Sequence, residues 1–207
     1  MLGTIDLPLF VVAGLLLNVT PGPDTLYIVG RSTLQGFRAG ATAALGIGAG
    51  AIVHTVAAAV GLSAVLAASA TAFTIVKWLG AAYLVYVGIS LLLSRPKEEE
   101  KRHLEPAGLR TVFLQGFFTN VLNPKVALFF LAFLPQFVDP AAPSKALALF
   151  FLGLVFNFNG TLWNLFVAWS SARVASTFRG AGRFALWFNR AAGGLFVYLG
   201  VRLAVSK

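Results

Sequence analysis

Two short polar segments interrupt long apolar stretches of this chain, and both combine ionisable and amide side chains with proline. The first reads Asn18-Val19-Thr20-Pro21-Gly22-Pro23-Asp24, and the second reads Asn120-Val121-Leu122-Asn123-Pro124-Lys125. Carboxylate, ammonium, hydroxyl and amide groups can together hold a small charged or zwitterionic molecule through hydrogen bonds. The two segments are therefore the first candidates for a binding site.

The prolines matter because of the apolar sequence around them. A proline within a helix removes one backbone donor and pushes its ring against the carbonyl four residues earlier. In a bilayer the freed groups cannot turn to lipid, so a broken helix persists only where it faces protein or a wet cavity. A matched pair of broken helices in two halves of a chain indicates the binding site of a transporter. We therefore predict a small transporter whose site lies where the two breaks meet.

The breaks also indicate what the site binds. The residues after Pro21 and Pro124 would begin new helix segments with free N–H groups and partial positive charge, which suits an anionic group such as a carboxylate. Neutral hydrogen-bonding groups accompany these helix ends, namely Asn18, Thr20, Asn120 and Asn123. The asparagines have an alternative role, the repair of carbonyls that proline leaves without a donor. One residue could serve both roles.

Asp24 and Lys125 form the most important ionisable pair. A charge within the hydrocarbon core is costly and usually faces a cavity or a partner. Our hypothesis is that Asp24 binds a substrate ammonium group, or alternates between that group and a proton. Lys125 would then neutralise Asp24 or attract the substrate carboxylate. The alternative is a structural salt bridge between the two side chains.

Other apolar stretches contain further polar residues. His54 is the only histidine within a predicted span and is a candidate for proton coupling, with a hydrogen-bonded packing role as the alternative. Asn157, Thr161 and Asn164 share one helix face at spacings of four and three. These three residues are candidates to line the transport path.

The composition is that of an integral membrane protein. Of 207 residues, 58% are hydrophobic and 11% are charged, and the mean hydropathy is +0.83, whereas soluble domains carry roughly 25% charged residues. Residues 39–76 and 146–172 contain no Asp, Glu, Lys or Arg, and each run exceeds the ~20 residues that a spanning helix needs. Cysteine is absent, which excludes disulfides and thiolate chemistry.

Apolar runs and turn signals predict an all-α integral membrane fold with six transmembrane helices, of which helices 1 and 4 are broken by proline. The predicted spans are residues 7–29, 40–66, 72–93, 112–136, 146–170 and 184–204. They form a single transmembrane domain, residues 1–207, with a first repeat of about 1–94, a cytoplasmic loop of about 95–110 and a second repeat of about 111–207.

Weak internal similarity supports the two repeats. Tyr86 and Gly88 fall on Tyr198 and Gly200 at an offset of 112, and the proline breaks align at an offset of 103. Because each half has an odd number of spans, the second half would be inserted upside down relative to the first. Such inverted repeats place the substrate site near the membrane midplane, between the halves.

The basic residues predict the orientation in the membrane. Most of them fall in the connections after the first, third and fifth spans: Arg31, Arg38, Arg95, Lys97, Lys101, Arg102, Arg110, Arg173, Arg179 and Arg183. Lysine and arginine concentrate in cytoplasmic loops, so these connections are predicted to be cytoplasmic and both termini periplasmic or extracellular. Topology thereby accounts for the net charge of +9, and no nucleic-acid partner is expected.

Several motifs occur in a fixed order along nearly the whole chain. They are Pro21-Gly22-Pro23-Asp24, Gly36-Phe37-Arg38-Ala39-Gly40, Lys77-Trp78-Leu79-Gly80-Ala81-Ala82-Tyr83-Leu84, Gly116-Phe117, Asn120, Asn123-Pro124-Lys125 and Phe133-Leu134-Pro135-Gln136-Phe137. In this order and spacing they resemble the LysE/RhtB family of bacterial amino-acid exporters. The resemblance implies export of amino acids or closely related metabolites across the bacterial inner membrane, driven by proton antiport. The direction of transport rests on this resemblance alone.

A six-helix ion or metal-cation transporter is the main alternative. Divalent cations usually need several carboxylates, imidazoles or thiolates, whereas the embedded candidates here are Asp24 and His54. An enzyme is disfavoured, because no paired carboxylates or two-histidine motif occur at membrane depth. We expect no cofactor or metal, and the expected partners are an amino-acid substrate, the lipid bilayer and protons. Small-residue helix faces are compatible with a homodimer.

Overall fold

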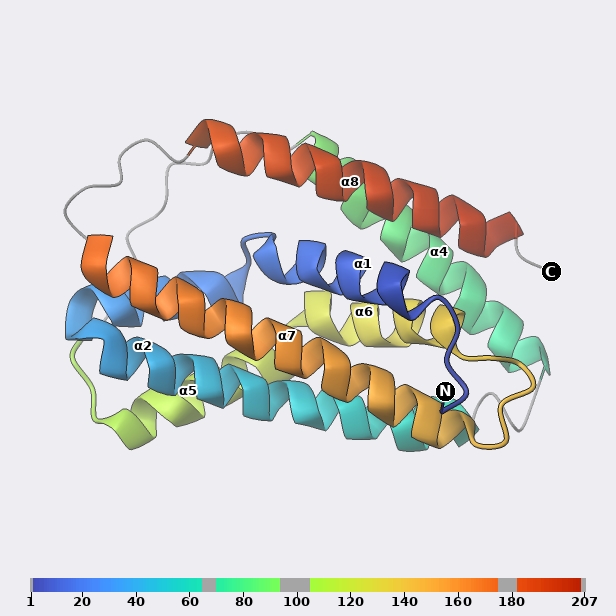
Figure 1. Cartoon of the computed structure of the whole chain (residues 1–207), viewed down its shortest axis with the longest axis horizontal. Coiled ribbons are helices and arrows are strands. Elements are labelled where there is room, and N and C mark those ends of the chain that lie inside the picture. Colours follow the sequence, from blue (N-terminus) through green and yellow to red (C-terminus); the bar gives the residue numbers. More distant parts are fainter. Residues whose placement is uncertain (1, 65–69, 94–104, 175–181, 206–207) are drawn as a thin grey trace.

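The computed structural model describes residues 2–64, 70–93, 105–174 and 182–205, and these residues are almost entirely helical. The elements are α1 (Leu7–Val19), α2 (Pro23–Ala57), a π-helical turn (Ala58–Leu62), α4 (Ala70–Leu92), α5 (Leu109–Val121), α6 (Pro124–Phe133), a 3-10 turn (Leu134–Phe137), α7 (Lys145–Val174) and α8 (Gly182–Val205). The described part contains no β-strand beyond one isolated bridge between Thr4 and Val138. The helices lie roughly along one long axis (Figure 1).

Helix α2 contains a sharp turn at Gly36, inside the connection predicted between residues 29 and 40, but the helix before it continues past the predicted end at residue 29. Gly36 has φ 78° and ψ −178° within it, a conformation that favours glycine. A Cβ atom on Gly40 would collide with the side chain of Ser32. Residues eight apart in a straight helix are ~12 Å apart, so this contact shows that the chain folds back. We call residues 23–35 the first arm of α2 and residues 37–57 its second arm.

Two helix pairs are interrupted at the polar segments. α1 ends at Val19 and α2 begins at Pro23, while α5 ends at Val121 and α6 begins at Pro124. A proline takes the first position of each new helix, where its missing N–H removes no helical hydrogen bond. The axes of α5 and α6 are bent by 47°.

By length and composition, two helical stretches in the described residues could each cross a membrane. They are Pro23–Leu62 and Lys145–Arg173, and the bent pair Leu109–Val121 and Pro124–Phe137 makes a third if it counts as one span. Shorter apolar helices cover Leu7–Val19 and Trp78–Ser90.

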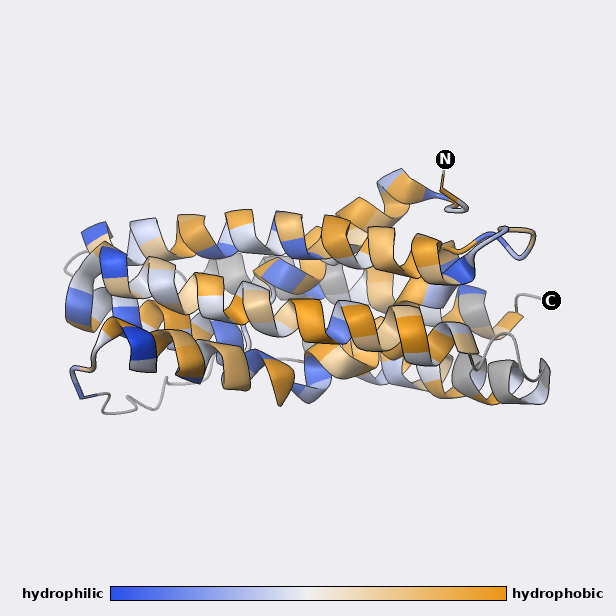
Figure 2. Cartoon of the chain, turned by 90° about the horizontal axis from the view of Figure 1, so that it is seen from below, coloured by the Kyte–Doolittle hydropathy of each residue, from blue (hydrophilic) through white to orange (hydrophobic). Residues whose placement is uncertain are grey.

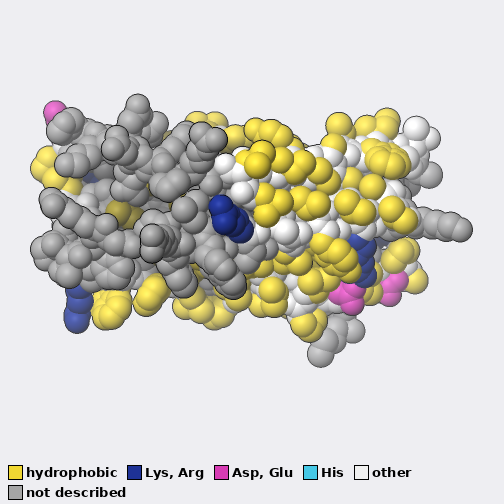
Figure 3. Space-filling model, turned by 90° about the horizontal axis from the view of Figure 1, so that it is seen from above, with side chains coloured by type: hydrophobic (Ala, Val, Ile, Leu, Met, Phe, Trp, Pro, Cys, Tyr) yellow, Lys and Arg dark blue, Asp and Glu magenta, His cyan; other side chains and the backbone are white. Residues whose placement is uncertain are grey.

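Large apolar side chains are exposed along the helices. Leu79, Tyr86 and Leu122 are 67%, 68% and 75% exposed, and hydrophobic side chains cover much of the described surface in Figure 3. In Figure 2 hydrophobic residues extend along the bundle, while hydrophilic residues gather toward the end where α2 turns. Soluble monomers rarely expose apolar patches on this scale. The chain is therefore a multi-pass membrane protein whose helices face lipid.

Glycines allow helices to come into close contact at two crossings. A Cβ atom on Gly116 would lie 2.7 Å from the Ala43 carbonyl oxygen, which places α5 directly against the second arm of α2. At the crossing of α4 and α8, a Cβ on Gly88 would lie 2.7 Å from Val197, and one on Gly200 would lie 2.8 Å from Val85. In these last two contacts each glycine packs against the valine of the other helix, and both the glycines and the valines are 112 residues apart in the sequence.

The two ends of the bundle differ in charge. The turn of α2, the start of α5 and the end of α7 lie together at one end, which we call the Gly36 end, and both chain termini lie at the other, the terminal end (Figure 1). Among the described residues, Arg38, Arg110 and Arg173 belong to the Gly36 end. Asp6 and Arg202 form an ion pair of 3.0 Å at the terminal end. Other basic residues that predicted the orientation lie outside the described residues: Arg95, Lys97, Lys101, Arg102 and Arg179.

Two buried apolar clusters flank a polar middle layer. The first, here the aromatic cluster, contains Phe10, Phe129, Phe133, Phe137 and Phe156. The second, here the aliphatic cluster, contains Ile28, Ala43, Ala44, Ile47, Val112, Val167 and Ala168. Along α7 the contacts pass from the aromatic cluster at Phe156 to the aliphatic cluster at Val167, so polar residues between them face the centre of the bundle.

Candidate functional site

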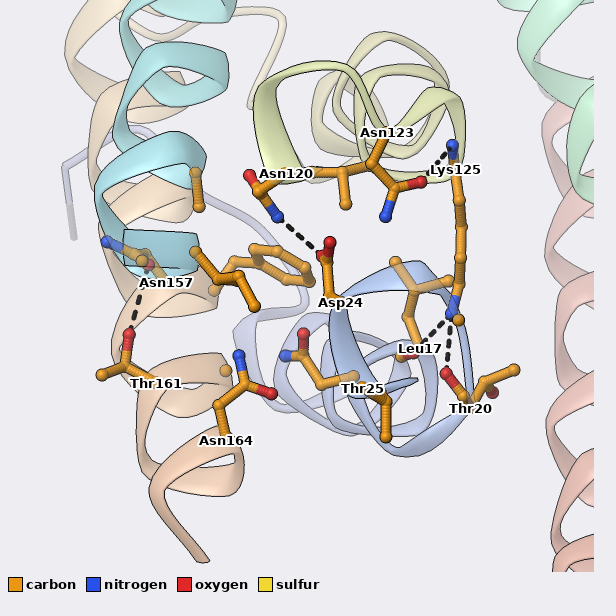
Figure 4. A pocket seen from close by; sticks show the side chains of 18 residues that line it. Leu17, Thr20, Asp24, Thr25, Asn120, Asn123, Lys125, Asn157, Thr161 and Asn164 are labelled. Carbon is orange, nitrogen blue, oxygen red and sulfur yellow. Dashed lines mark hydrogen bonds between the residues drawn. The ribbon is translucent and has the colours of Figure 1, made fainter. Parts of the chain in front are cut away.

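A pocket lies between the two helix interruptions and is bounded by α1, both arms of α2, α5, α6 and α7 (Figure 4). Ten of the predicted residues line it: Asn18, Thr20, Gly22, Asp24, Asn120, Asn123, Lys125, Asn157, Thr161 and Asn164. Pro21, Pro23, Pro124 and His54 are not among its lining residues. The prolines instead set the helix ends that give the pocket its shape.

Asp24 lies in the first turn of α2, where the helix dipole favours a negative charge. Its Oδ2 accepts a hydrogen bond of 2.8 Å from Asn120 Nδ2, which joins the two interrupted segments (Figure 4). Its Oδ1 is buried and has no hydrogen-bond partner among the described residues, and the same holds for Asn120 Oδ1. A buried acceptor without a donor costs about 1–3 kcal/mol. Two such oxygens on the pocket wall indicate a place for a ligand donor.

Asn18 offers the complementary group. Its amide nitrogen is also buried and unpartnered. Its side chain lies over Gly160 of α7, where a Cβ would be 3.0–3.2 Å from the Asn18 amide atoms. The absence of a side chain at Gly160 therefore gives Asn18 its position in the pocket.

Lys125 forms no salt bridge with Asp24, so the structural salt bridge between them is wrong for this structure. Within the described residues the two side chains form no ion pair, and Lys125 Nζ donates to the carbonyl oxygens of Leu17 at 3.0 Å and Thr20 at 2.9 Å (Figure 4). The Leu17 carbonyl would accept from residue 21 in a continuous helix, but that residue is proline. Lys125 therefore satisfies carbonyls that the first interruption leaves free.

His54 has the equivalent role at the second interruption. Its Nε2 lies 3.0 Å from the carbonyl oxygen of Asn120, and since a carbonyl only accepts, the imidazole nitrogen donates. Asn120 precedes Pro124 by four residues, so its carbonyl lacks the N–H that a continuous helix would supply and accepts instead from the backbone N–H of Asn123 at 2.9 Å and from His54. The repair of both breaks thus involves Lys125 and His54, which leaves the side chains of Asn18 and Asn120 facing the pocket.

Asn123 combines a local and a pocket position. Its Oδ1 accepts a hydrogen bond of 3.0 Å from the backbone N–H of Lys125, so Asn123 caps the N-terminus of α6. Thr20 also bonds locally, because its hydroxyl donates to the Leu16 carbonyl at 2.7 Å. Both residues are nevertheless buried on the pocket wall.

Helix α7 supplies the opposite wall. The Thr161 hydroxyl donates to Asn157 Oδ1 at 3.4 Å, and Asn164 lies one turn further along (Figure 4). Sequence reasoning missed several lining residues: Leu17, Thr25, Ile47, Gly48, Ala51, Val126, Phe156 and Gly160. The importance of Gly48 is visible only in the structure, where a Cβ at that position would lie 2.9 Å from the Thr161 hydroxyl. Apolar residues give no such signal, because they resemble lipid-facing ones.

Substitution of Gly160 by valine is expected to impair the pocket without unfolding the protein. The added side chain would push against Asn18, and overpacking typically costs ~1–3 kcal/mol. We expect solute binding to weaken by about tenfold. Gly194→Val is the matched control, because no atom lies within 4 Å of a Cβ at that position of α8. Equal binding by the two variants, measured by isothermal titration, would show that the Asn18 position is unimportant.

Within the described residues, no three His, Asp or Glu side chains gather as a metal-binding group. The pocket instead presents one carboxylate, several amides and hydroxyls, and an apolar wall that includes Ile47, Val126 and Phe156. Such a surface can bind a small molecule by hydrogen bonds at one end and by apolar contact at the other.

Comparison with known proteins identifies the family. The LysE type translocator family matches residues 15–207. An uncharacterized membrane protein of Pseudomonas aeruginosa is 31% identical over 210 residues, covering 99% of this chain and 97% of that protein. A leucine efflux protein of Salmonella typhimurium is 28% identical over 208 residues, covering 99% of this chain and 97% of that protein. No solved structure matches this chain. The chain therefore belongs to the LysE type translocator family and is a membrane transporter rather than an enzyme.

Proposed function

We propose that this transporter exports neutral amino acids with apolar side chains from the cytoplasm, in exchange for protons. Family membership and the relatives named leucine efflux proteins support an amino-acid exporter. The pocket supports the finer assignment, as follows.

The main support for this substrate class comes from polar atoms in the pocket that have no hydrogen-bond partner among the described residues. Asp24 Oδ1 and Asn120 Oδ1 are acceptors that suit an α-ammonium group, and Asn18 Nδ2 is a donor that suits a carboxylate. The N-terminus of α2 adds free N–H groups and partial positive charge beside them. A zwitterion therefore satisfies groups of both kinds at once.

The rest of the pocket wall favours a substrate with a neutral side chain. Leu17, Ile47, Val126 and Phe156 offer apolar contact. Of the described residues that line the pocket, Asp24 is the only one with a carboxylate, so a substrate with a second ammonium would bury a charge without a counter-charge. Unpaired buried charge is strongly unfavourable. Lysine and arginine should accordingly be poor substrates.

We assign the helices to six spans in two inverted repeats, with α1 and the first arm of α2 as one broken span and α5 and α6 as the other. The reciprocal contacts of Gly88 and Gly200 support this symmetry. Under the positive-inside rule the Gly36 end is cytoplasmic and the termini are periplasmic, in a bacterial inner membrane. Asp24 is the proposed proton carrier, because it can bind either a proton or the substrate ammonium. His54, which bonds to the Asn120 carbonyl, would support proton coupling by stabilising the interruption between α5 and α6.

Counterflow in proteoliposomes tests the substrate class. Vesicles loaded with one unlabelled amino acid are diluted into the same radiolabelled compound, and transient accumulation reports exchange. We expect accumulation with leucine and other neutral apolar amino acids, and at least about tenfold less with lysine, because its second charge lacks a partner. Equal exchange of lysine would contradict the neutral-substrate assignment. Exchange of inorganic cations but of no amino acid would contradict the export proposal itself.

A further inference from the structure

Arg31 lies in a different place from the one its sequence position predicted. The sequence predicts it in a cytoplasmic connection, whereas the structure places it in the first arm of α2, where it is only 2% exposed. The prediction was wrong because the helix continues through Gln35 before it turns at Gly36. A buried guanidinium usually has a carboxylate partner, because an unpaired buried charge is costly. Within the described residues Arg31 has none.

Neutral oxygens surround Arg31 instead. Its Nη1 donates to the Glu105 carbonyl oxygen at 2.8 Å, and its Nη2 donates to Gln115 Oε1 at 2.7 Å. A second bond from Nη1 reaches Gln35 Oε1 at 3.0 Å, and Nε donates to the Tyr27 hydroxyl at 3.2 Å. With the described residues the guanidinium therefore makes four hydrogen bonds, none of them to a charged group.

The network joins two parts of the chain that are far apart in sequence. Tyr27, Arg31 and Gln35 belong to the first arm of α2, whereas Gln115 belongs to α5 and Glu105 precedes that helix. Further bonds cross the same boundary: the Tyr27 hydroxyl is within donating distance of the Val112 carbonyl at 2.9 Å and Gln115 Oε1 at 3.0 Å. Gln35 Nε2 donates to the Ala107 carbonyl at 2.9 Å, and its Oε1 accepts from the Ala107 N–H at 3.2 Å. Under the proposed repeats, this boundary separates the two halves of the transporter.

The network also lies between the pocket and the Gly36 end. Asp24, Tyr27 and Arg31 follow one another at spacings of three and four, so they share one face of the first arm. Arg31 is seven residues, or ~10 Å along the helix, from Asp24. The aliphatic cluster with Ile28 and Val112 lies at the same level. A solute that moves along the bundle axis from the Gly36 end to the pocket would meet this layer.

The opposite exit is closed by other means. Toward the terminal end the aromatic cluster packs Phe129 against Phe156 with ring centroids 4.8 Å apart, and Phe129 against Phe133 at 4.6 Å. These contacts are apolar, so separating them would expose rings. If the helices separated at Arg31, its hydrogen bonds could be replaced by bonds to water. The guanidinium would then be hydrated again, which removes the free-energy cost of burying its charge.

We propose that Arg31, with Tyr27, Gln35 and Gln115, forms a latch that closes the pocket toward the Gly36 end and opens for each substrate to pass. Neutral acceptors suit this role, because they hold the closed state without the strong attraction of an ion pair. The side of the membrane on which the latch acts rests on the orientation in the proposed function. The closure itself does not depend on which substrate is carried.

The absence of cysteine makes a direct test possible. Thr25→Cys places a single thiol on the pocket wall, and a membrane-impermeant thiol reagent is applied to one face of sealed vesicles at a time. A separate Arg38→Cys variant, at an exposed position, identifies the face on which the Gly36 end lies. With the latch intact, the pocket thiol should react slowly from that face. Adding Arg31→Gln should accelerate the reaction from that face by about tenfold, since bonds from a charged donor are lost.

The matched control is Arg38→Gln, which removes an exposed positive charge from the same end and should leave the rate unchanged. Tyr27→Phe provides a second variant that preserves shape, and it should accelerate labelling in the same direction by a smaller factor. Labelling of the wild-type background as fast as the Arg31→Gln background would overturn the latch. Because labelling needs no substrate, failure of amino-acid counterflow alongside accelerated labelling would reject the proposed function and leave the latch standing.

Discussion

Replacement of Asp24 by asparagine is expected to weaken binding of a neutral amino acid by about 10- to 100-fold, because a hydrogen bond to a charged group contributes ~1.5–3 kcal/mol. The variant keeps a side chain of the same size that can still bond to Asn120. It loses the negative charge that the proposed site offers to the substrate ammonium. Isothermal titration of the purified proteins with leucine measures the difference.

The protein offers a matched carboxylate for comparison. Asp139 accepts a hydrogen bond of 2.8 Å from the backbone N–H of Ala141 at the terminal end, and asparagine can accept the same bond. Asp139→Asn should therefore bind leucine like the wild type. If Asp24→Asn also bound leucine normally while remaining folded, the ammonium would have to bind elsewhere.

The second large effect concerns stability. Lys125→Met should lower the free energy of unfolding by about 1–3 kcal/mol, because the Leu17 and Thr20 carbonyls would lose a buried donor. Methionine has a similar length and no donor, so it isolates the hydrogen bonds from the packing. The midpoint of thermal unfolding in detergent, compared with Lys145→Met as the control for loss of a positive charge, measures the effect.

A double variant separates this account from a salt bridge. If Lys125 mainly neutralised Asp24, the unpaired carboxylate would be the cause of instability, and adding Asp24→Asn to Lys125→Met would restore it. The observed hydrogen bonds predict no recovery, since the carbonyls at the first interruption would still be unpaired. Full recovery in the double variant would contradict the role assigned here to Lys125.

The positions of the helix interruptions could be predicted from sequence because proline acts locally. The loss of one N–H at Pro124 ends a helix whatever the rest of the chain does, and polar residues beside it must face something other than lipid. For the same reason Asn18, Asp24 and Asn120 could be identified as pocket residues. Helix spacing similarly indicated that Asn157 and Thr161 share a face.

The partners of these residues could not be predicted, because they depend on how distant helices pack. Lys125 is one residue from its own break, yet its Nζ reaches carbonyls of α1. Arg31 looked like a loop residue because Gly36 reverses the chain within one residue rather than over a longer connection. The turn falls in the predicted connection between residues 29 and 40, but the sequence does not show that the helix continues to Gln35 before it.

The most direct test of the account is efflux of preloaded radiolabelled leucine from proteoliposomes, with and without an imposed pH gradient. The account predicts that the pH gradient accelerates leucine efflux in the wild type and in Asp139→Asn. In Asp24→Asn, efflux should fall to the level of leucine-loaded vesicles that contain no protein. Gradient-stimulated efflux that survives in a folded Asp24→Asn variant, or the absence of leucine efflux from folded wild-type protein, would contradict it.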